Sequence, residues 1–156
     1  MPIVTGSVQE APTVRPSSEQ LAAWRTFLRA HSHVVRRLES ELLAAGELPL
    51  ASYDVLVQLT EAPQRRLRMT ELADRVLLSR SGLTRLVDRL ERQGLVRREP
   101  CPDDARGMYA VATDDGVDRL RQASRVHLDG VRRHFVDRFG ADELVALGGL
   151  LGRLST

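Results

Sequence analysis

The sequence contains no lysine, so all 23 of its basic residues are arginine. A GC-rich genome would produce the same bias without any functional demand. The absence of lysine by itself therefore does not point to a particular function. Cysteine occurs once, as Cys101, which excludes a disulfide within the chain and fits a reducing cytoplasm. No run of about 18 apolar residues occurs, so we expect no membrane-spanning helix, no membrane partner and a cytoplasmic location.

Short catalytic motifs are also missing from the sequence. It has no G-x-S-x-G, no H-E-x-x-H, no phosphate-binding loop and no Rossmann glycine fingerprint. The pair Gly148-Gly149 lies in a leucine-rich segment without a preceding strand, which favours a packing role. We therefore expect that the protein is not an enzyme and holds no cofactor.

Histidine is scarce, with four residues, and no Cys/His cluster has the spacing of metal ligands. His31 and His33 are two positions apart, so on a helix they would point about 200° apart and could not share one ion. If the fold brings His31 next to His127 or His134 of another helix, these residues can bind one metal ion together. Metal sensing is therefore an alternative interpretation. We expect no metal site and interpret His31 as a packing residue or as part of a ligand pocket.

The first 16 residues lack the basic and then apolar layout of a signal peptide, and we expect residues 1–16 to form a disordered lead. The remaining residues, 17–156, are enough for one domain with a hydrophobic core and hardly enough for two.

Apolar residues recur at steps of three and four in several segments, the pattern of amphipathic helices. Ser17 followed by Gln20 indicates a capping box, which opens a helix of roughly 26 residues that ends at Gly46. Its apolar or aromatic stripe consists of Leu21, Trp24, Leu28, Val35, Leu38 and Leu42, with His31 in the same stripe. Further helices are predicted at 50–61, 71–76, 80–93, from 114 to a break at Gly140, and at 141–154, with N-caps Thr70, Ser79 and Thr113.

The apolar pattern changes period after Gly94, which suits the left-handed conformation that ends many helices. Leu95–Glu99 and Met108–Ala112 are predicted as two short strands around a polar turn, Pro100–Gly107. Two short helices followed at once by a two-stranded ribbon is the order of a winged helix-turn-helix. We therefore predict a mainly α fold with a two-stranded β wing.

Positive charge is concentrated in residues 79–98, which contain six arginines and two acidic residues, a local net charge of +4 in a chain of net charge +2. Such an island is the electrostatic pattern of a phosphate-binding face, and a helix fits the major groove of DNA. The predicted DNA-contacting residues are Ser79, Arg80, Ser81, Thr84 and Arg85 on the helix and Arg97, Arg98 and Arg106 on the wing. A solvated charged face is the alternative interpretation, and it is the favoured one for Arg89 and Arg92.

From Leu21 to Leu154 the chain resembles the MarR (multiple antibiotic resistance regulator) family of transcriptional regulators. The segment MTELADRVLLSRSGLTRLVDRLERQGLVRREPCPDDARGMYAVATDDG is similar to the family's helix-turn-helix, wing and following helix. The resemblance implies that Asp104 buttresses Arg106 while this arginine reads the minor groove at the tip of the wing. The family often has two adjacent arginines here, and Ala105 stands in place of the first, which weakens the case for a second phosphate contact.

The resemblance also implies a homodimer formed by residues 17–48 and 114–156, with a winged helix-turn-helix at 50–113 between them. Such a dimer binds a pseudo-palindromic operator in double-stranded DNA, most often as a repressor. A winged-helix module that binds protein in place of DNA is the alternative.

Relatives in this family commonly bind small anionic aromatic compounds between the dimer helices and the DNA-binding lobe. Trp24, Asp54 and Arg85 resemble residues of the family's urate-responsive subgroup. Each has a simpler interpretation: Trp24 as dimer core, Asp54 as a charge near a helix N-terminus and Arg85 as a DNA contact. The candidate ligand-binding residues are Trp24, His31 and Asp54.

Cys101 falls in the predicted wing near Arg97 and Arg98, which would favour a thiolate. Redox sensing is one interpretation of this residue, and an incidental exposed cysteine is the favoured one.

Overall fold

The computed structural model describes residues 15–76 and 78–154. Residues 1–14, which make up most of the predicted disordered lead, lie outside the described residues. The contacts within the chain divide it into a unit that ends at His33 and a unit that begins at Val34, and each is described here by itself. None of the described helices combines the length and hydropathy that crossing a membrane requires.

Helix α1 (Ser18–Ala44) begins at the predicted capping box. The Gln20 N–H donates to Ser17 Oγ at 3.2 Å, and the Ser17 N–H donates to Gln20 Oε1 at 2.8 Å. Within the first unit this helix carries a row of rings, because Trp24 stacks on Phe27 at 5.9 Å between centroids and Phe27 lies 6.3 Å from His31. All three side chains are exposed.

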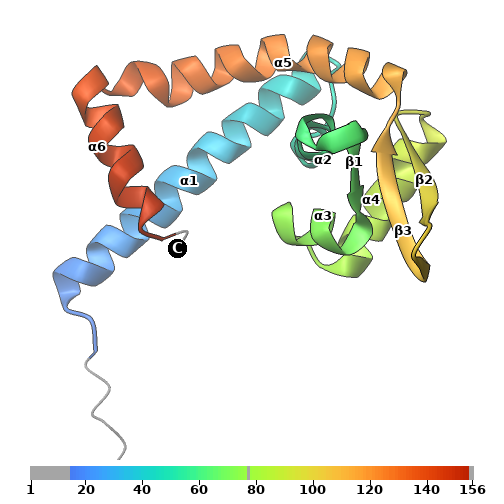
Figure 1. The fold of residues 1–156 in the computed structure, drawn as a ribbon. Coiled ribbons are helices and arrows are strands. Elements are labelled where there is room, and N and C mark those ends of the chain that lie inside the picture. Colours follow the sequence, from blue (N-terminus) through green and yellow to red (C-terminus); the bar gives the residue numbers. More distant parts are fainter. Residues whose placement is uncertain (1–14, 77, 155–156) are drawn as a thin grey trace, which may run out of the picture. The chain divides into compact units, whose positions relative to one another are not determined.

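The second unit contains the remaining elements (Figure 1). The helices after α1 are α2 (Leu50–Glu61), α3 (Met69–Arg75), α4 (Arg80–Arg92), α5 (Asp114–His134) and α6 (Ala141–Gly152), with short 3-10 turns η1 (Pro63–Arg65) and η2 (Val136–Arg138). The strands are β1 (Arg66–Arg68), β2 (Val96–Cys101) and β3 (Asp104–Ala112). We call residues 50–113 the winged lobe.

The core of the winged lobe forms where the predicted apolar faces meet. Val55, Leu56 and Leu59 of α2 are fully buried, as is Leu72 of α3. The inward face of α4 is buried as predicted, and it consists of Leu83, Leu86, Val87 and Leu90. Burying these side chains stabilises the lobe and directs the opposite face of α4 toward solvent.

The sheet has three antiparallel strands in the order β1-β3-β2, so the predicted hairpin is confirmed and a further strand adds to it. Leu67 of β1 pairs with Ala110 of β3. A three-residue strand shows only one polar-apolar-polar alternation in the sequence, which is too short to predict a strand, and the pairing with β3 defines it.

Several predicted boundaries differ from the structure. Thr70 is not an N-cap, because the chain enters α3 directly from β1 and the helix already begins at Met69 without a side-chain cap. The predicted turn 100–107 is wrong over most of its length, since β2 continues to Cys101 and β3 begins at Asp104. Polar residues are compatible with these strands because the ladder is formed by backbone groups.

The caps at Ser79 and Thr113 are confirmed. Ser79 Oγ accepts from the Gly82 N–H at 3.1 Å, and Thr113 Oγ1 accepts from the Gly116 N–H at 3.0 Å. Each hydroxyl satisfies an amide that has no partner within the first turn of its helix.

Helix α5 is fastened to the end of α1 and to the loop that follows it. His134 Nε2 lies 2.6 Å from Glu41 Oε1, and Arg133 donates to the other oxygen of that carboxylate at 3.1 Å. Arg119 donates to Glu47 and, at 2.9 Å, to the Gly46 carbonyl. These contacts place the second half of α1 beside α5 within the second unit.

Candidate functional site

The outer face of α4 presents polar and positively charged side chains to solvent. The exposed residues on this face are Arg80, Ser81, Thr84, Arg85, Arg89 and Arg92. Ser79 is also exposed, although its hydroxyl is used as the N-cap. The five residues that were predicted as DNA contacts on this helix thus lie together on an exposed face, and Arg89 and Arg92, for which a solvated face was predicted, are exposed beside them.

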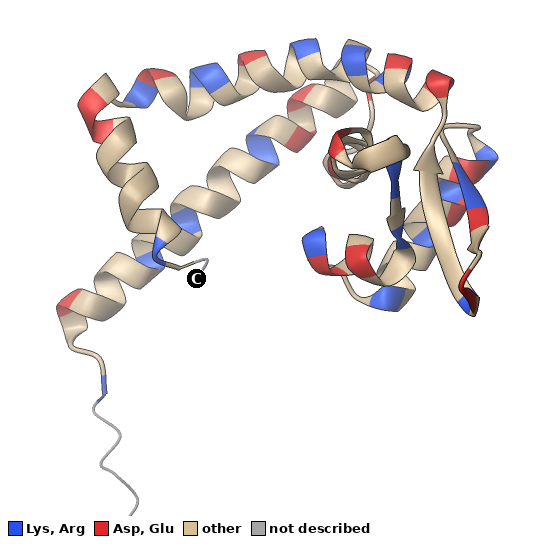
Figure 2. Ribbon diagram, viewed as in Figure 1, with Lys and Arg blue, Asp and Glu red and all other residues tan. Residues whose placement is uncertain are grey.

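The guanidinium groups of Arg80, Arg85 and Arg89 have no carboxylate partner among the described residues. Figure 2 shows blue segments on α4, on β1 and at the tip of the wing. An arginine without a partner on an exposed helix face keeps its full charge and all its donors for a ligand. This availability separates these residues from Arg97 and Arg98 of the wing, which pair with carboxylates.

The Arg98 guanidinium forms its hydrogen bonds within the winged lobe. Its guanidinium donates to Asp88 at 2.7 Å and to Glu91 at 2.5 Å, and more weakly to the Thr84 carbonyl at 3.4 Å. Its side chain is only 20% exposed. Burial opposes the charge, but the hydrogen bonds to both carboxylates outweigh it and raise the pKa of Arg98. Arg98 therefore joins β2 to α4.

Arg97 projects from the other side of β2 and is more exposed, at 56% of its side chain. It forms an ion pair with Glu99, whose other oxygen lies 3.6 Å from Arg66. The two adjacent arginines that were predicted as DNA contacts therefore have different surroundings.

The tip of the wing holds Asp104 and Arg106. Asp104 Oδ1 accepts from the Arg106 backbone N–H at 3.1 Å, and Asp104 Oδ2 pairs with Arg68 Nη1 at 3.3 Å. Asp104 thus holds the backbone at Arg106 and a guanidinium from β1, while the Arg106 guanidinium is exposed and has no carboxylate partner among the described residues.

A hollow of about 310 Å³ lies between the start of α3, α4 and the wing. Its lining consists of Arg68, Met69, Thr70, Thr84, Arg98, Asp104, Arg106, Gly107 and Met108. Sequence reasoning missed Arg68, whose place here depends on the unpredicted strand β1. Arg66 and Arg68 also lie over the Tyr109 ring, at 4.7 and 5.8 Å from its centroid. The alternation Arg66-Leu67-Arg68 was the one trace of that strand in the sequence.

Cys101 is 4% exposed, so the expectation of an exposed cysteine is wrong. A Cβ atom placed on Gly107 would lie 2.9 Å from Cys101 Sγ, which shows that the neighbouring strand covers the thiol. The longer hairpin explains this, because it turns the predicted loop residue into a strand residue with a side chain that lies against Gly107 of β3.

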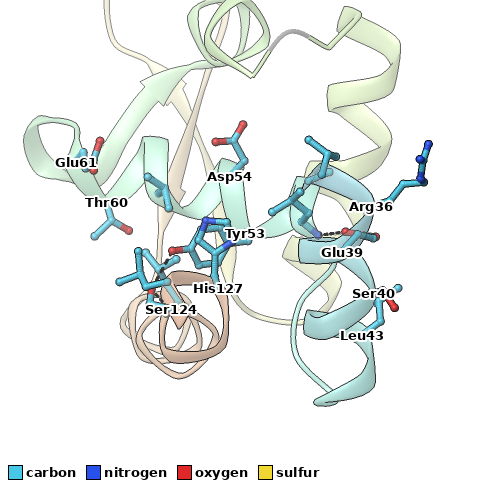
Figure 3. Close-up of a pocket in the computed structure, with 16 residues that line it drawn as sticks. Arg36, Glu39, Ser40, Leu43, Tyr53, Asp54, Thr60, Glu61, Ser124 and His127 are labelled. Carbon is cyan, nitrogen blue, oxygen red and sulfur yellow. Dashed lines mark hydrogen bonds between the residues drawn. The ribbon is translucent and has the colours of Figure 1, made fainter. Parts of the chain in front are cut away.

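A second hollow, a cleft of about 1310 Å³, lies between the second half of α1, α2 and α5 (Figure 3). Much of its lining is apolar: Val35, Leu43, Leu50, Val57, Leu120 and Leu128. Its polar lining includes Arg36, Glu39, Tyr53, Asp54, Ser124 and His127. We call this hollow the α2–α5 cleft.

Two ionisable side chains of the α2–α5 cleft are partly buried, His127 and Asp54. Among the described residues, His127 Nδ1 is a buried atom without a hydrogen-bond partner, whereas the Asp54 carboxylate is not fully buried. By contrast, the Tyr53 hydroxyl lies 3.2 Å from Ser124 Oγ, and the Tyr53 ring packs against the His127 ring at 4.3 Å between centroids.

The ionisation of both groups reflects their burial. Burial raises the pKa of Asp54, and the nearby His127 only partly opposes this shift. Burial lowers the pKa of His127, and the nearby Asp54 only partly opposes that shift. Both shifts favour the neutral form of the side chain.

Of the three predicted ligand residues, Asp54 lines this cleft, whereas Trp24 and His31 belong to the ring row of the first unit. His127, which was considered only as a metal ligand, and Tyr53 and Ser124 were missed as lining residues. They come from helices whose relative placement the sequence does not encode locally. Within residues 15–76 and 78–154, no three His, Cys, Asp or Glu side chains gather as metal ligands would.

Comparisons with known proteins agree with this arrangement. The sequence model of the MarR family matches residues 47–107. The HTH-type transcriptional repressor YetL of Bacillus subtilis is 32% identical over 115 residues, which cover 72% of this chain and 69% of that protein.

Two solved structures from Streptomyces coelicolor are also similar. The MarR family transcriptional regulator AbsC is 35% identical, with a TM-score of 0.82 over 92% of this chain and 96% of that chain. A second MarR family regulator, solved in complex with DNA, is 37% identical, with a TM-score of 0.83 over 91% of this chain and 89% of that chain. The protein is therefore a transcriptional regulator of the MarR family and not an enzyme.

Proposed function

We propose that the protein binds double-stranded DNA in a sequence-specific manner through α4 and the wing. The observation that carries this proposal is the set of unpaired guanidinium groups on the exposed face of α4, at Arg80, Arg85 and Arg89. The similar Streptomyces regulator solved with DNA supports it.

The chemistry of the two elements suits the two grooves of DNA. A helix fits the major groove, where an arginine can donate two hydrogen bonds to one guanine. Arg80 and Arg85 near the start of α4 are placed for such contacts, and Ser81 and Thr84 add short hydroxyls. Arg106 at the tip of the wing extends to the neighbouring minor groove, and Asp104 holds its backbone for that role.

The protein acts as a homodimer in this proposal, with residues 17–48 and 114–156 as the dimerisation helices and 50–113 as the winged helix-turn-helix. Large apolar side chains on these helices are exposed in the single chain: Trp24 at 54%, Leu128 at 60%, Val145 at 78% and Leu150 at 54%. A second copy would cover them, and two recognition helices related by a two-fold axis would read a pseudo-palindromic operator.

Regulation by a ligand completes the proposal. The regulator acts in the cytoplasm and represses transcription, and the similar protein YetL is a transcriptional repressor by its name. A small molecule in the α2–α5 cleft then releases the operator. Binding would favour a dimer in which the spacing of the recognition helices no longer fits the DNA.

A mobility-shift assay on the duplex upstream of the protein's own gene tests the DNA-binding proposal. We expect wild-type protein to prefer this duplex over a scrambled one, and to lose roughly 10³-fold in affinity between about 50 and 200 mM salt. Arg106→Ala should weaken binding, because it removes a contact in the minor groove. Arg121→Ala is the matched control, since Arg121 is exposed on α5 and pairs only with Asp118.

Equal effects of the two substitutions would contradict the role of the wing. No binding of the wild type to any duplex at low salt would favour the winged-helix module that binds protein.

A further inference from the structure

The Asp104 carboxylate at the tip of the wing is shared between two strands. Its Oδ1 accepts from the Arg106 backbone N–H at 3.1 Å, and its Oδ2 pairs with Arg68 Nη1 at 3.3 Å. Gly107 lies close to the second oxygen, since a Cβ atom there would be 2.9 Å from Oδ2. The cation that occupies this oxygen comes from β1, a strand outside the β2–β3 hairpin that forms the wing.

The sheet directs Arg68 to this place. Arg68 is in register with Tyr109 of β3, and its guanidinium lies 5.8 Å from the centroid of the Tyr109 ring. Leu67 is buried in the core, and successive side chains of a strand point to opposite faces. Arg66 and Arg68 therefore share the face opposite to Leu67, and Arg68 is the one that meets Asp104.

The partner of Asp104 matters for Arg106. These two residues are two positions apart in β3, so their side chains leave the same face of the strand. A carboxylate without a partner would attract the neighbouring guanidinium and would hold its donors at the protein surface. Because Asp104 Oδ2 pairs with Arg68, the Arg106 guanidinium is left without a carboxylate partner among the described residues.

The charge balance of the hollow between α3, α4 and the wing points the same way. Among the described residues of its lining, Asp104 is the one acid. Arg98 of the lining pairs instead with Asp88 and Glu91. Arg68 is thus the cation that offsets the charge of Asp104, and a carboxylate without this offset would repel a phosphate backbone.

We propose that Arg68 is a positioning residue of the wing. It pairs with Asp104, keeps the Arg106 guanidinium free for the minor groove, and does not itself contact DNA. This inference rests on the proposed DNA binding and adds a residue of β1 to the pair Asp104 and Arg106 that the family resemblance implied.

Fluorescence anisotropy of the labelled duplex from upstream of the protein's own gene, titrated with the full-length protein at about 50 mM salt, tests the inference. Arg68→Gln removes the charge and keeps much of the side-chain stem. We expect it to weaken binding at least fivefold, because Asp104 is then free to pair with Arg106.

Arg66→Gln is the matched control. Arg66 lies on the same strand and closer to the same ring, at 4.7 Å from its centroid, but it faces Glu99 at 3.6 Å and not Asp104. We expect a change in DNA affinity of less than twofold. Both ion pairs are partly exposed and contribute little to stability, and thermal unfolding checks that both variants are folded. Equal losses of affinity in the two variants would overturn the inference.

The same substitution in Arg106→Ala protein separates positioning from a direct contact. Without the Arg106 side chain Arg68 has nothing to position, so we expect Arg68→Gln to cost less than twofold in this background. An equal loss in both backgrounds would mean that Arg68 contacts DNA by itself, and would overturn the inference.

The wild-type protein distinguishes a failure of this inference from a failure of the proposed function. Binding of the wild type together with an unchanged affinity of folded Arg68→Gln overturns the role of Arg68 alone. Failure of the wild type to bind any duplex overturns the proposed function and this inference with it.

Discussion

At the scale of single residues, Arg97 and Arg98 show how strand geometry gives neighbouring residues different tasks. Successive side chains of a strand point to opposite faces, so Arg98 meets the carboxylates of α4 while Arg97 faces solvent beside Glu99. The contacts of Arg98 fix the wing against the recognition helix. It serves as a positioning residue for the DNA-binding surface and has few donors left for phosphate.

We expect Arg98→Ala to destabilise the protein by about 1–2 kcal/mol, because Asp88 and Glu91 lose a partly buried charged donor and are themselves partly screened by solvent. Arg97→Ala is the matched control and should stay within about 0.5 kcal/mol of wild type, because its ion pair is exposed. Urea unfolding at neutral pH measures both. A larger loss in Arg97→Ala than in Arg98→Ala would contradict the assigned roles.

At the scale of elements, caps and close contacts decide how helices join the sheet. Thr113 caps α5 and also donates to the Gly94 carbonyl at 2.6 Å, which fastens the start of this helix to the turn before β2. Gly116 lies in the first turn of α5 and faces the same turn. A Cβ atom on Gly116 would lie 2.1 Å from the Leu95 carbonyl oxygen, so only glycine allows this approach.

Gly116→Ala should therefore destabilise the protein by about 1–3 kcal/mol, since the backbone has to move to admit the methyl group. Gly148→Ala is the matched control: nothing lies within 4 Å of its added Cβ in α6, and alanine favours a helix by about 0.5–1 kcal/mol. Thermal unfolding compares the two variants with wild type. Equal stability of the two variants would show that the backbone at the start of α5 shifts to admit the methyl group without lowering the free energy of unfolding.

At the scale of the whole molecule, the apolar stripe of α1 is exposed in its first half, whereas Leu38 and Leu42 in its second half are buried. Trp24 and Leu28 are 54% and 42% exposed, and large apolar patches on regulators mark association surfaces. The operator affinity of the proposed dimer depends on the burial of these side chains by a second copy, because one winged lobe alone makes half of the contacts with DNA.

We expect Leu28→Glu to shift the protein toward monomer at micromolar concentration and to weaken operator binding at least tenfold, because a buried unpaired charge disfavours the interface. His33→Glu, on the opposite face of the same helix, should leave the dimer intact. Sedimentation equilibrium measures the oligomeric state of both variants. A dimeric Leu28→Glu protein would place the interface elsewhere.

The sequence by itself determined the helices, their caps at Ser17, Ser79 and Thr113, and the buried face of α4. These features depend on residues within a few positions of one another, where helical period and side-chain caps act. It also determined that α4 carries the positive island, since charge is a property of composition.

Only the tertiary structure decided which arginines are free to contact a ligand and which are paired with carboxylates of the lobe. Arg98 is paired and Arg85 is not because α4 and β2 meet in space on one side of the helix. Strand β1, the buried thiol of Cys101 and the α2–α5 cleft likewise depend on contacts between distant segments. Such contacts leave no periodic pattern in the sequence, because each is formed by single residues that the packing of the whole lobe brings together.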